Sequence, residues 1–410
     1  MIIDVCIVGG GASGLMAASY LSKRGLSVCL LEGSKELGKK LSLTGNGRCN
    51  ITNKDLRSSC YNSSDDSFVS KIFEAVPNER LLSIIHEFGV STKSINGYFY
   101  PMSLSAKSVV NALSGKNKNL SILFSSKVRE IVKDDSIFKL YGDRESKEKD
   151  RPLLCEAKNV ILSCGGSSFP KTGSDGSGYK LLEKMGLKVN RPLPALNSLF
   201  VNDFDRSLSG VRQVGKVKLF VDENEVDNSY GEIQFTKEGL SGICIYQVSS
   251  KASKALDKNK KVEICLDYLP EMNESDVKAE IYYRYKNLEG SSKDVLNTLF
   301  PDKMINHLLN TCNIDEERES SSITDKELNL LVTTIKNDKF DIIGIDGFKT
   351  SQTTTGGLDL SEVDDNMQSK KIKNLFITGE LLDCDGICGG YNLYLAFSSA
   401  IIAADRILNK

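Results

Sequence analysis

Three glycines near the start of the chain, Gly9, Gly11 and Gly14, stand between an apolar run and a segment of small residues. The apolar run at 2–8 predicts a parallel strand buried on both faces, and the segment at 12–24 predicts the helix that follows it. In such a turn the first glycine allows the tight bend, the second lets a pyrophosphate approach the backbone, and the third lets helix and strand pack closely. The spacing therefore predicts a Rossmann-like unit at the beginning of the chain.

A second strand is expected at 27–31, and the acidic residue Glu32 follows it directly. A carboxylate at this place can accept hydrogen bonds from ribose hydroxyls, and the free N–H groups of a helix N-terminus bind phosphates. The chain is therefore expected to bind an adenine dinucleotide. This pattern alone leaves open whether that dinucleotide is FAD or NAD.

A second informative segment lies near the end of the chain, where an apolar strand at 375–380 ends in Gly379 and Glu380. Several glycines follow, and an apolar helix is expected over 392–408. In flavoproteins with two dinucleotide-binding domains, an acidic residue at this place contacts the cofactor, and the next helix points its N-terminus at the flavin ring. Only a flavin needs an anion site so far from the pyrophosphate, so this segment favours FAD as the resident cofactor.

Length and composition set the frame for these motifs. A chain of 410 residues is too long for one ordinary core, so two or three domains are expected. Lysine plus arginine (53) nearly balances aspartate plus glutamate (54), which gives no global argument for nucleic acid or a membrane as partner. Without a basic leader or a long apolar run, a cytoplasmic protein is expected. Two histidines and scattered cysteines predict no metal site.

Helix and strand signals alternate at both ends of the chain, whereas the middle is rich in strand signals. We expect an α/β fold: a discontinuous Rossmann-like FAD-binding domain with an inserted β-rich, barrel-like domain and a helical subdomain. The predicted bounds are 1–190 and 350–410 for the FAD-binding domain, 191–270 and 332–349 for the β-rich substrate domain, and 271–331 for the helical subdomain. Local expectations are an irregular loop over 38–53, a helical region over 68–88, a charged hairpin over 134–150 and a strand at 347–350.

The loop from Gly38 to Asn53 carries a specific run of glycine, lysine, asparagine and arginine residues. It resembles the signature of the BaiN/YhiN-like flavoproteins, a family of NAD(P)/FAD-dependent oxidoreductases. Further segments at 165–174, 235–242 and 379–399 are similar to the family in the expected order, so the resemblance spans nearly the whole chain.

The resemblance, together with the glycine pattern, implies a set of residues that bind FAD. Within it, Lys40 and Arg48 are expected to bring positive charge toward phosphate or reduced flavin, and Gly45 and Gly47 to allow close backbone approach. The full set is Gly9, Gly11, Ala12, Ser13, Gly14, Glu32, Gly33, Lys39, Lys40, Leu41, Thr44, Gly45, Asn46, Gly47, Arg48, Cys49, Asn50, Val128, Gly165, Gly379, Glu380, Asp385, Gly390, Asn392 and Leu393.

Three positions depart from the family pattern. Lys237 stands where the family usually has histidine, Ile243 where it has proline, and Asn46 where glycine is commoner. If that histidine donates a proton in other members, the acid here must be Lys237 or another residue. Tyr391, at the start of the last helix, is the other candidate donor, although an aromatic residue that packs on the ring system is an equally good interpretation.

The resemblance implies reduction of a C=C bond conjugated to a carbonyl, with hydride passing from NAD(P)H through flavin N5 and a protein acid protonating the α-carbon. The implied substrates are 3-oxo-Δ4 or Δ6 steroid intermediates of bile acid catabolism, or a uridine of ribosomal RNA reduced to dihydrouridine. The balanced charge favours the small molecule, in a cleft between the FAD-binding and inserted domains. Oxidation of an amine (an aminoketone) and a non-catalytic flavin redox module are further alternatives.

Three cysteines and one lysine-rich segment can each be interpreted as structural or as functional. Cys49, Cys384 and Cys388 lack the CxxC spacing of redox pairs, which favours packed thiols. The lysine-rich segment at 251–261 is most simply a solvated helix face, but it would contact phosphates if the substrate were RNA.

Overall fold

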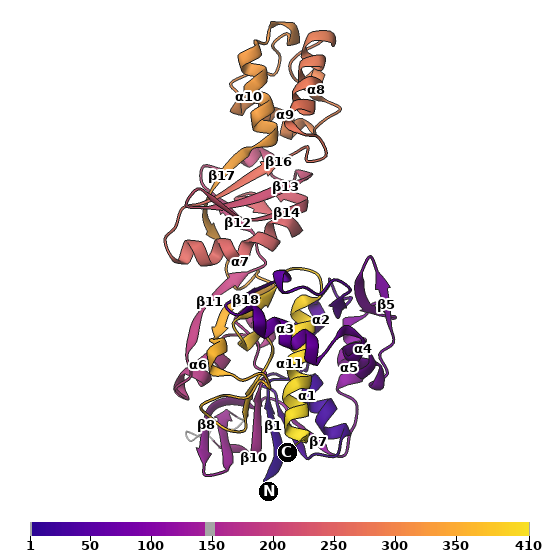
Figure 1. Ribbon diagram of the computed structural model, residues 1–410, viewed down its shortest axis with the longest axis vertical. Helices are drawn as coiled ribbons and strands as arrows, with labels where there is room; N and C mark the ends of the chain where they lie inside the picture. The colour runs from indigo at the N-terminus through magenta and orange to yellow at the C-terminus, as the bar shows by residue number, and fades with distance from the viewer. Residues whose placement is uncertain (1, 144–151, 410) are drawn as a thin grey trace. The chain divides into compact units, whose positions relative to one another are not determined.

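The computed structural model describes residues 2–143 and 152–409, which divide into two compact units (Figure 1). The first unit comprises Met1–Pro194 and Phe348–Lys410, and the second comprises Ala195–Gly347. A sheet with both parallel and antiparallel strands forms the centre of the first unit, and a closed barrel of antiparallel strands forms the centre of the second. The predicted fold class, a discontinuous Rossmann-like domain with an inserted barrel, is confirmed.

The first unit is built on a seven-stranded sheet whose parallel part has the order β7, β2, β1, β10, β19. The long strand β10 pairs with β19 through 160–162 and with β9 through 153–157, so it joins the parallel core to an antiparallel extension. Residues 144–150 of the expected hairpin lie outside the described part of the chain. The strands are β1 (Ile3–Val8), β2 (Val28–Leu31), β7 (Leu120–Leu123), β8 (Lys127–Asp134), β9 (Ile137–Asp143), β10 (Leu153–Leu162) and β19 (Leu375–Ile377).

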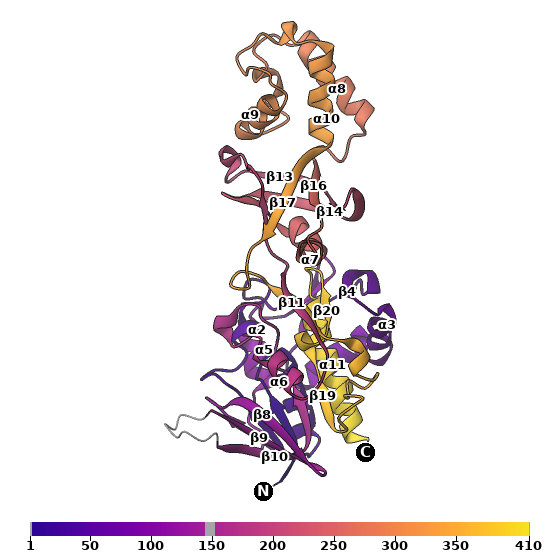
Figure 2. The same ribbon diagram turned by 90° about the vertical axis from the view of Figure 1, so that its left-hand side faces the viewer.

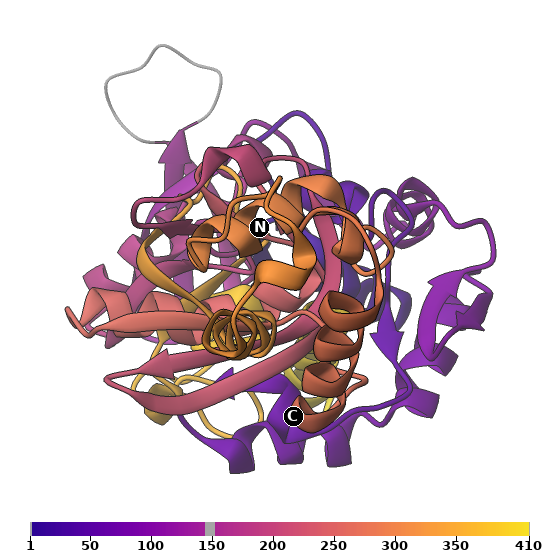
Figure 3. The same ribbon diagram turned by 90° about the horizontal axis from the view of Figure 1, so that it is seen from above.

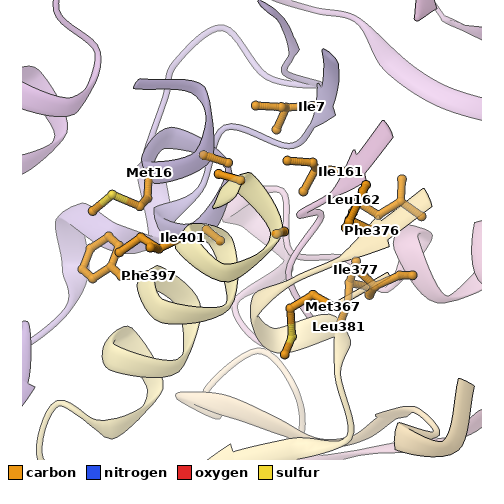
Figure 4. Close-up of a cluster of buried hydrophobic side chains, with 14 of the residues drawn as sticks. Ile7, Met16, Ile161, Leu162, Met367, Phe376, Ile377, Leu381, Phe397 and Ile401 are labelled. Carbon is orange, nitrogen blue, oxygen red and sulfur yellow. The ribbon is translucent and has the colours of Figure 1, made fainter. Parts of the chain in front are cut away.

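Two helices from opposite ends of the chain, α1 (Ala12–Lys23) and α11 (Tyr391–Leu408), lie side by side in this unit. Figure 4 shows Met16 of α1 beside Phe397 and Ile401 of α11, within the core that they share with the sheet. This core fixes the turns at the carboxyl ends of the strands. Among the described residues, no helix is long and apolar enough to cross a membrane.

Small antiparallel pairings and short helices complete the first unit. The sheet β3-β6-β5 is formed by β3 (Thr52–Asn53), β6 (Tyr98–Pro101) and β5 (Thr92–Ile95). The strand pairs are β4 (Tyr61–Ser63) with β20 (Cys384–Gly386), and β11 (Val189–Ala195) with β18 (Thr353–Leu358). The helices are α2 (Lys39–Leu43), α3 (Asp66–Ala75), α4 (Asn78–Glu87), α5 (Ala106–Leu113) and α6 (Ser177–Lys184).

Three local expectations were wrong. The loop over 38–53 contains α2, because buried Leu41 packs this five-residue helix against α5. The helical region over 68–88 is two helices, since Pro77 is the N-cap of α4 and cannot continue α3. No strand forms at 347–350; the strand is β18, whose β-branched threonines are fully buried.

In the second unit, a six-stranded antiparallel barrel closes in the order β12, β15, β14, β13, β16, β17. Figure 2 shows α10 continuing into β17, and Figure 3 shows the orange helical segment over the barrel strands. These helices share one buried core with the barrel. The elements are β12 (Leu199–Val201), β13 (Arg212–Val221), β14 (Asn224–Phe235), β15 (Gly239–Ser241), α7 (Ile243–Asp257), β16 (Val262–Asp267), α8 (Glu274–Asn287), α9 (Asp302–Thr311), α10 (Asp325–Lys336) and β17 (Asp338–Ile345).

Candidate cofactor site

A cavity of about 380 Å³ lies in the first unit. Its wall includes the residues that directly follow β1, β2, β10 and β19. These strands are parallel, so their carboxyl ends meet at one edge of the sheet, which is where open α/β sheets bind ligands. The fold therefore places the cavity at the expected end of the sheet.

The cavity wall contains most of the residues predicted to bind FAD. Those in the wall are Gly9, Gly11, Ala12, Ser13, Glu32, Gly33, Lys39, Lys40, Leu41, Thr44, Val128, Gly165, Gly379, Glu380, Asn392 and Leu393. Those outside it are Gly14, Gly45, Asn46, Gly47, Arg48, Cys49, Asn50, Asp385 and Gly390. For the second group, a direct contact with the cofactor stays a prediction.

The three glycines of the first turn occupy distinct environments. Gly9 has a φ of +102°, and a Cβ there would lie 2.5 Å from the backbone oxygen of Ser163. A Cβ on Gly14 would overlap the Gly9 carbonyl oxygen, whereas one on Gly11 would meet no atom within 4 Å. Gly9 therefore permits the turn, Gly11 leaves room for a pyrophosphate and Gly14 allows helix and strand to pack closely, as the sequence predicts.

The N-terminus of α1 and the Glu32 carboxylate form one side of the wall. α1 has Gly11 as N-cap, no side-chain cap and no acidic residue in its first turn, so no side chain of the helix itself competes for its first N–H groups at the cavity. Glu32 accepts hydrogen bonds from the Gly10 N–H at 2.8 Å and the Ser34 N–H at 2.7 Å. Each carboxylate oxygen keeps a lone pair for a further donor, such as a ribose hydroxyl.

Lys40 and Glu380 form an ion pair in the wall. The Lys40 Nζ lies 2.7 Å from Oε2 and 3.0 Å from Oε1 of Glu380, and the Thr354 N–H donates to Oε1 at 2.9 Å. Both charged side chains are mostly shielded from solvent. The expected role of Lys40 as a free positive charge is therefore reduced, because Glu380 already neutralises it.

Lys39 and Lys171 are the cations of the wall that make no ion pair within the described residues. Ser174, which also lines the cavity, has a buried hydroxyl with no hydrogen-bond partner in the described part of the chain. A buried orphan hydroxyl indicates a missing partner. FAD fits this wall: its diphosphate matches two ammonium groups and a helix N-terminus, and its ribose and phosphate oxygens can satisfy Ser174.

We expect Lys39→Met and Lys171→Met each to weaken FAD binding about fivefold at low salt, because each removes a cation with no competing carboxylate. The loss should shrink as ionic strength rises. Fluorescence of FAD released from the purified holoprotein measures this at several salt concentrations.

Lys127→Met is the matched control, since Lys127 lines the same wall but pairs with Asp175. Equal losses in all three variants would contradict a specific role for the unpaired lysines.

The two candidate proton donors lie in different units. Tyr391 is buried, and its hydroxyl donates to the Asp55 carbonyl at 3.0 Å, while its ring packs edge-on against Tyr61. It does not line the cavity, and burial raises its pKa. Lys237 lies in the second unit, exposed in the turn between β14 and β15. These contacts support the interpretation of Tyr391 as a packed aromatic residue.

The cysteines near the cavity are thiols without disulfides. Burial raises the pKa of Cys49 to about 12 and that of Cys388 to about 12, so both stay protonated at neutral pH. Cys384 is buried in the cavity wall. This supports the interpretation as packed thiols, because the reactive form of cysteine is the thiolate.

Several wall residues were not predicted from the sequence. The most informative are Lys171 and Ser174, in a turn that follows β10. A Cβ on Gly173 would lie 4.0 Å from Oε1 of Glu32, so this turn lies beside the carboxylate that is predicted to bind the ribose. The sequence of this turn resembles the family, but the resemblance alone did not indicate which role Lys171 and Ser174 have.

Together, the sheet and the cavity define a dinucleotide-binding fold of the Rossmann class. Residues 3–406 match the HI0933-like protein Rossmann domain, so the chain belongs to the HI0933-like family of FAD-dependent proteins. This confirms the resemblance inferred from the loop signature.

Curated relatives fall into two groups. The chain is 34% identical over 404 residues to the 3-dehydro-bile acid delta(4,6)-reductase of Clostridium scindens, with 97% of each protein covered. It is 27% identical over 406 residues to the ribosomal RNA dihydrouridine synthase of Haemophilus influenzae, with 97% of this chain and 96% of that protein covered. Identity to the Escherichia coli ribosomal RNA dihydrouridine synthase is 26% over 417 residues, with 99% and 98% covered.

Proposed function

We propose that this chain is an FAD-dependent reductase of a C=C bond conjugated to a carbonyl, with NAD(P)H as hydride donor and a 3-oxo-Δ4 or Δ6 steroid acid as substrate. The observation that carries the proposal is the 34% identity to the bile acid reductase along 97% of both chains. Identity to the two RNA-modifying relatives is lower, at 27% and 26%. Both groups reduce the same kind of bond, which supports the reaction type independently of the substrate.

The residues of the cavity wall have defined tasks in such a reaction. Bound FAD supplies a hydride carrier between NAD(P)H and the substrate. Glu32 and the N-terminus of α1 hold and orient the adenosine half, as the glycine turn permits. The N-terminus of α11, with Gly390 as N-cap and no acidic residue in its first turn, can stabilise negative charge that develops near Asn392.

The lysine-rich segment over 251–261 supports the small-molecule alternative over RNA. Lys251 forms an ion pair with Asp227 at 2.8 Å, and Lys260 forms one with Asp222 at 2.9 Å. Two of its cations are thus already neutralised, which weakens the segment as a phosphate-binding surface.

Turnover by the purified holoprotein tests the proposal. We expect a 3-oxo-4-ene steroid acid to lose its enone absorbance with NADH or NADPH, each supplied in a separate reaction. Ribosomal RNA from cells that lack the corresponding modification serves as the second substrate. Dihydrouridine formation without steroid turnover would reverse the assignment, and peroxide release from an aminoketone would favour amine oxidation.

Lys237 remains the proposed proton donor, with Tyr391 as the alternative. We expect Lys237→Met to lower kcat about 100-fold with unchanged FAD content, as loss of a general acid does. Tyr391→Phe should instead lower the free energy of unfolding by about 1 kcal/mol, because it removes the hydrogen bond to Asp55. A large kcat loss in Tyr391→Phe alone would exchange the two roles.

A further inference from the structure

One face of the small sheet β3-β6-β5 in the first unit carries aromatic and cationic side chains. Ile95 lies opposite Tyr98, and Lys93 lies opposite Tyr100, in the pairing of β5 with β6. Directly opposed residues, and every second residue along a strand, point to the same side of a sheet. Lys93, Ile95, Tyr98 and Tyr100 therefore share one face, and Asn53 of β3, opposite Tyr98, belongs to it as well.

Arg48 extends this face. Its guanidinium carbon lies 5.9 Å from the centre of the Tyr100 ring, which is the distance of a cation–π contact. Its hydrogen bond is a long one, from Nε to the Gly45 carbonyl at 3.4 Å. We refer to Arg48, Lys93, Tyr98 and Tyr100 as the arginine–tyrosine face.

Both cations of the arginine–tyrosine face lack a carboxylate partner in the part of the chain that the structure describes. The nearby acidic residue Asp55, which follows β3, is neutralised by Arg57 at 2.7 Å. The face thus offers uncompensated positive charge beside aromatic surface, with Tyr98 37% exposed. A ligand that complements it has an anionic group next to a flat apolar body.

The arginine–tyrosine face adjoins the end of the cofactor cavity at α11. The Asn53 side chain donates to the Gly389 carbonyl at 3.1 Å, and a Cβ on Gly389 would lie 3.1 Å from the Tyr98 ring. Gly389 and Gly390 lead directly into α11, whose Asn392 and Leu393 line the cavity. The short segment Gly389–Leu393 therefore connects the face to this end of the cavity wall.

We propose that the arginine–tyrosine face binds the substrate, with Arg48 pairing with a carboxylate and the two tyrosines packing on a fused ring skeleton. The inference rests on the proposed function, since it takes the ring to be that of a steroid acid. It assigns Arg48 to the substrate, whereas the family resemblance implies a contact with FAD. The contact that favours the substrate is the one with Tyr100, because it places the Arg48 guanidinium beside an aromatic surface on which a flat ring can pack.

The test compares a 3-oxo-4-ene steroid acid with its methyl ester, using the holoprotein. We expect Arg48→Gln to raise KM for the acid at least about tenfold and to change KM for the ester less than about twofold. Because the proposal assigns Arg48 to the substrate, we expect the FAD content of this variant to match that of the wild type. Arg48→Lys should restore part of the affinity, because it keeps the charge but loses the planar fork. Tyr100→Leu should weaken acid and ester alike.

Lys54→Gln is the matched control, since it removes an exposed cation next to β3 that is not part of the face. Equal effects of Arg48→Gln on acid and ester would overturn the proposal, and so would a loss of FAD affinity. If wild-type protein reduces neither steroid, the proposed function fails. Calorimetric titration of the steroid acid into holoprotein then tests the face separately: binding that Arg48→Gln abolishes supports it, and absence of binding overturns it. Arg48-dependent binding of an RNA oligonucleotide in place of the acid would overturn it in favour of RNA.

Discussion

Gly14→Ala is expected to yield protein that retains no FAD and is less stable by about 3 kcal/mol or more. The added Cβ would overlap the Gly9 carbonyl oxygen, and a backbone oxygen cannot rotate away as a side chain can. Either α1 must move off β1 or the Gly9 turn must open. Both changes displace the N–H groups that face the cavity. Thermal unfolding and the flavin-to-protein absorbance ratio of the purified protein measure the two effects.

Gly11→Ala is the matched control, because it adds the same methyl group three residues earlier. Its φ of −80° suits alanine, and no atom lies within 4 Å of the new Cβ. We expect stability to change by less than about 1 kcal/mol, whereas FAD affinity falls about tenfold because the methyl group projects into the cavity. Equal loss of stability in both variants would refute the separate roles of these glycines.

Features formed by residues that are adjacent in sequence, such as the turn with Gly9, Gly11 and Gly14, could be predicted from the sequence. The first turn is determined by local geometry: β1, the glycines, α1 and β2 follow one another along the chain, so their spacing predicted them. The same holds for the strand and helix near Gly379, where an apolar run and a glycine turn are again adjacent in sequence.

Residues that act through distant partners were harder to predict. Lys40 and Glu380 form an ion pair although they are 340 residues apart in the sequence, and nothing in the local sequence of either residue indicates the pair. The turn with Ser174 belongs to the wall only because β10 delivers it beside Glu32. Tyr391 was a candidate donor from its place at a helix start, but the position of Asp55 commits its hydroxyl to the backbone. Such contacts depend on tertiary packing, which residue spacing does not encode.

A buried ionic cluster in the second unit provides the other large expected effect. His307 of α9 is 8% exposed, and its Nε2 lies 2.9 Å from Oδ2 of Asp338 on β17. Its Nδ1 lies 3.4 Å from Oδ2 of Asp205, and the Tyr268 hydroxyl donates to the same Asp338 oxygen at 2.6 Å. Desolvation alone would lower the pKa of His307, but the carboxylates of Asp338 and Asp205 raise it above its ordinary value. The folded state therefore favours the imidazolium.

The sign of the pH dependence follows from this raised pKa. The stabilisation is fully present below the unfolded pKa of about 6.5, and it is lost as the pH rises through the higher folded pKa of His307. Asp205 acts in a different range: despite desolvation, hydrogen bonds from Ser207 and His307 lower its pKa, so its contribution is lost only in acid. We therefore expect the second unit to lose stability as the pH is raised from about 6.5, by about 1.4 kcal/mol for each tenfold difference in proton affinity between the folded and unfolded states.

His307→Gln should abolish this slope, because an amide does not titrate in this range. Both His307→Gln and His307→Leu leave Asp338 buried without its cation, and His307→Leu, which also removes the hydrogen bond, should cost about 3–5 kcal/mol. Hydrogen exchange of peptides from α9 and β17, measured across a pH series and corrected for intrinsic rates, reports the effect where it arises. His86→Gln is the control, since His86 is the chain's other histidine and is exposed on α4. A slope that survives in His307→Gln would show that another group carries it. A pH dependence that disappears in His307→Gln and persists in His86→Gln would identify protonation of His307 as the event that stabilises the packing of α9 on the barrel.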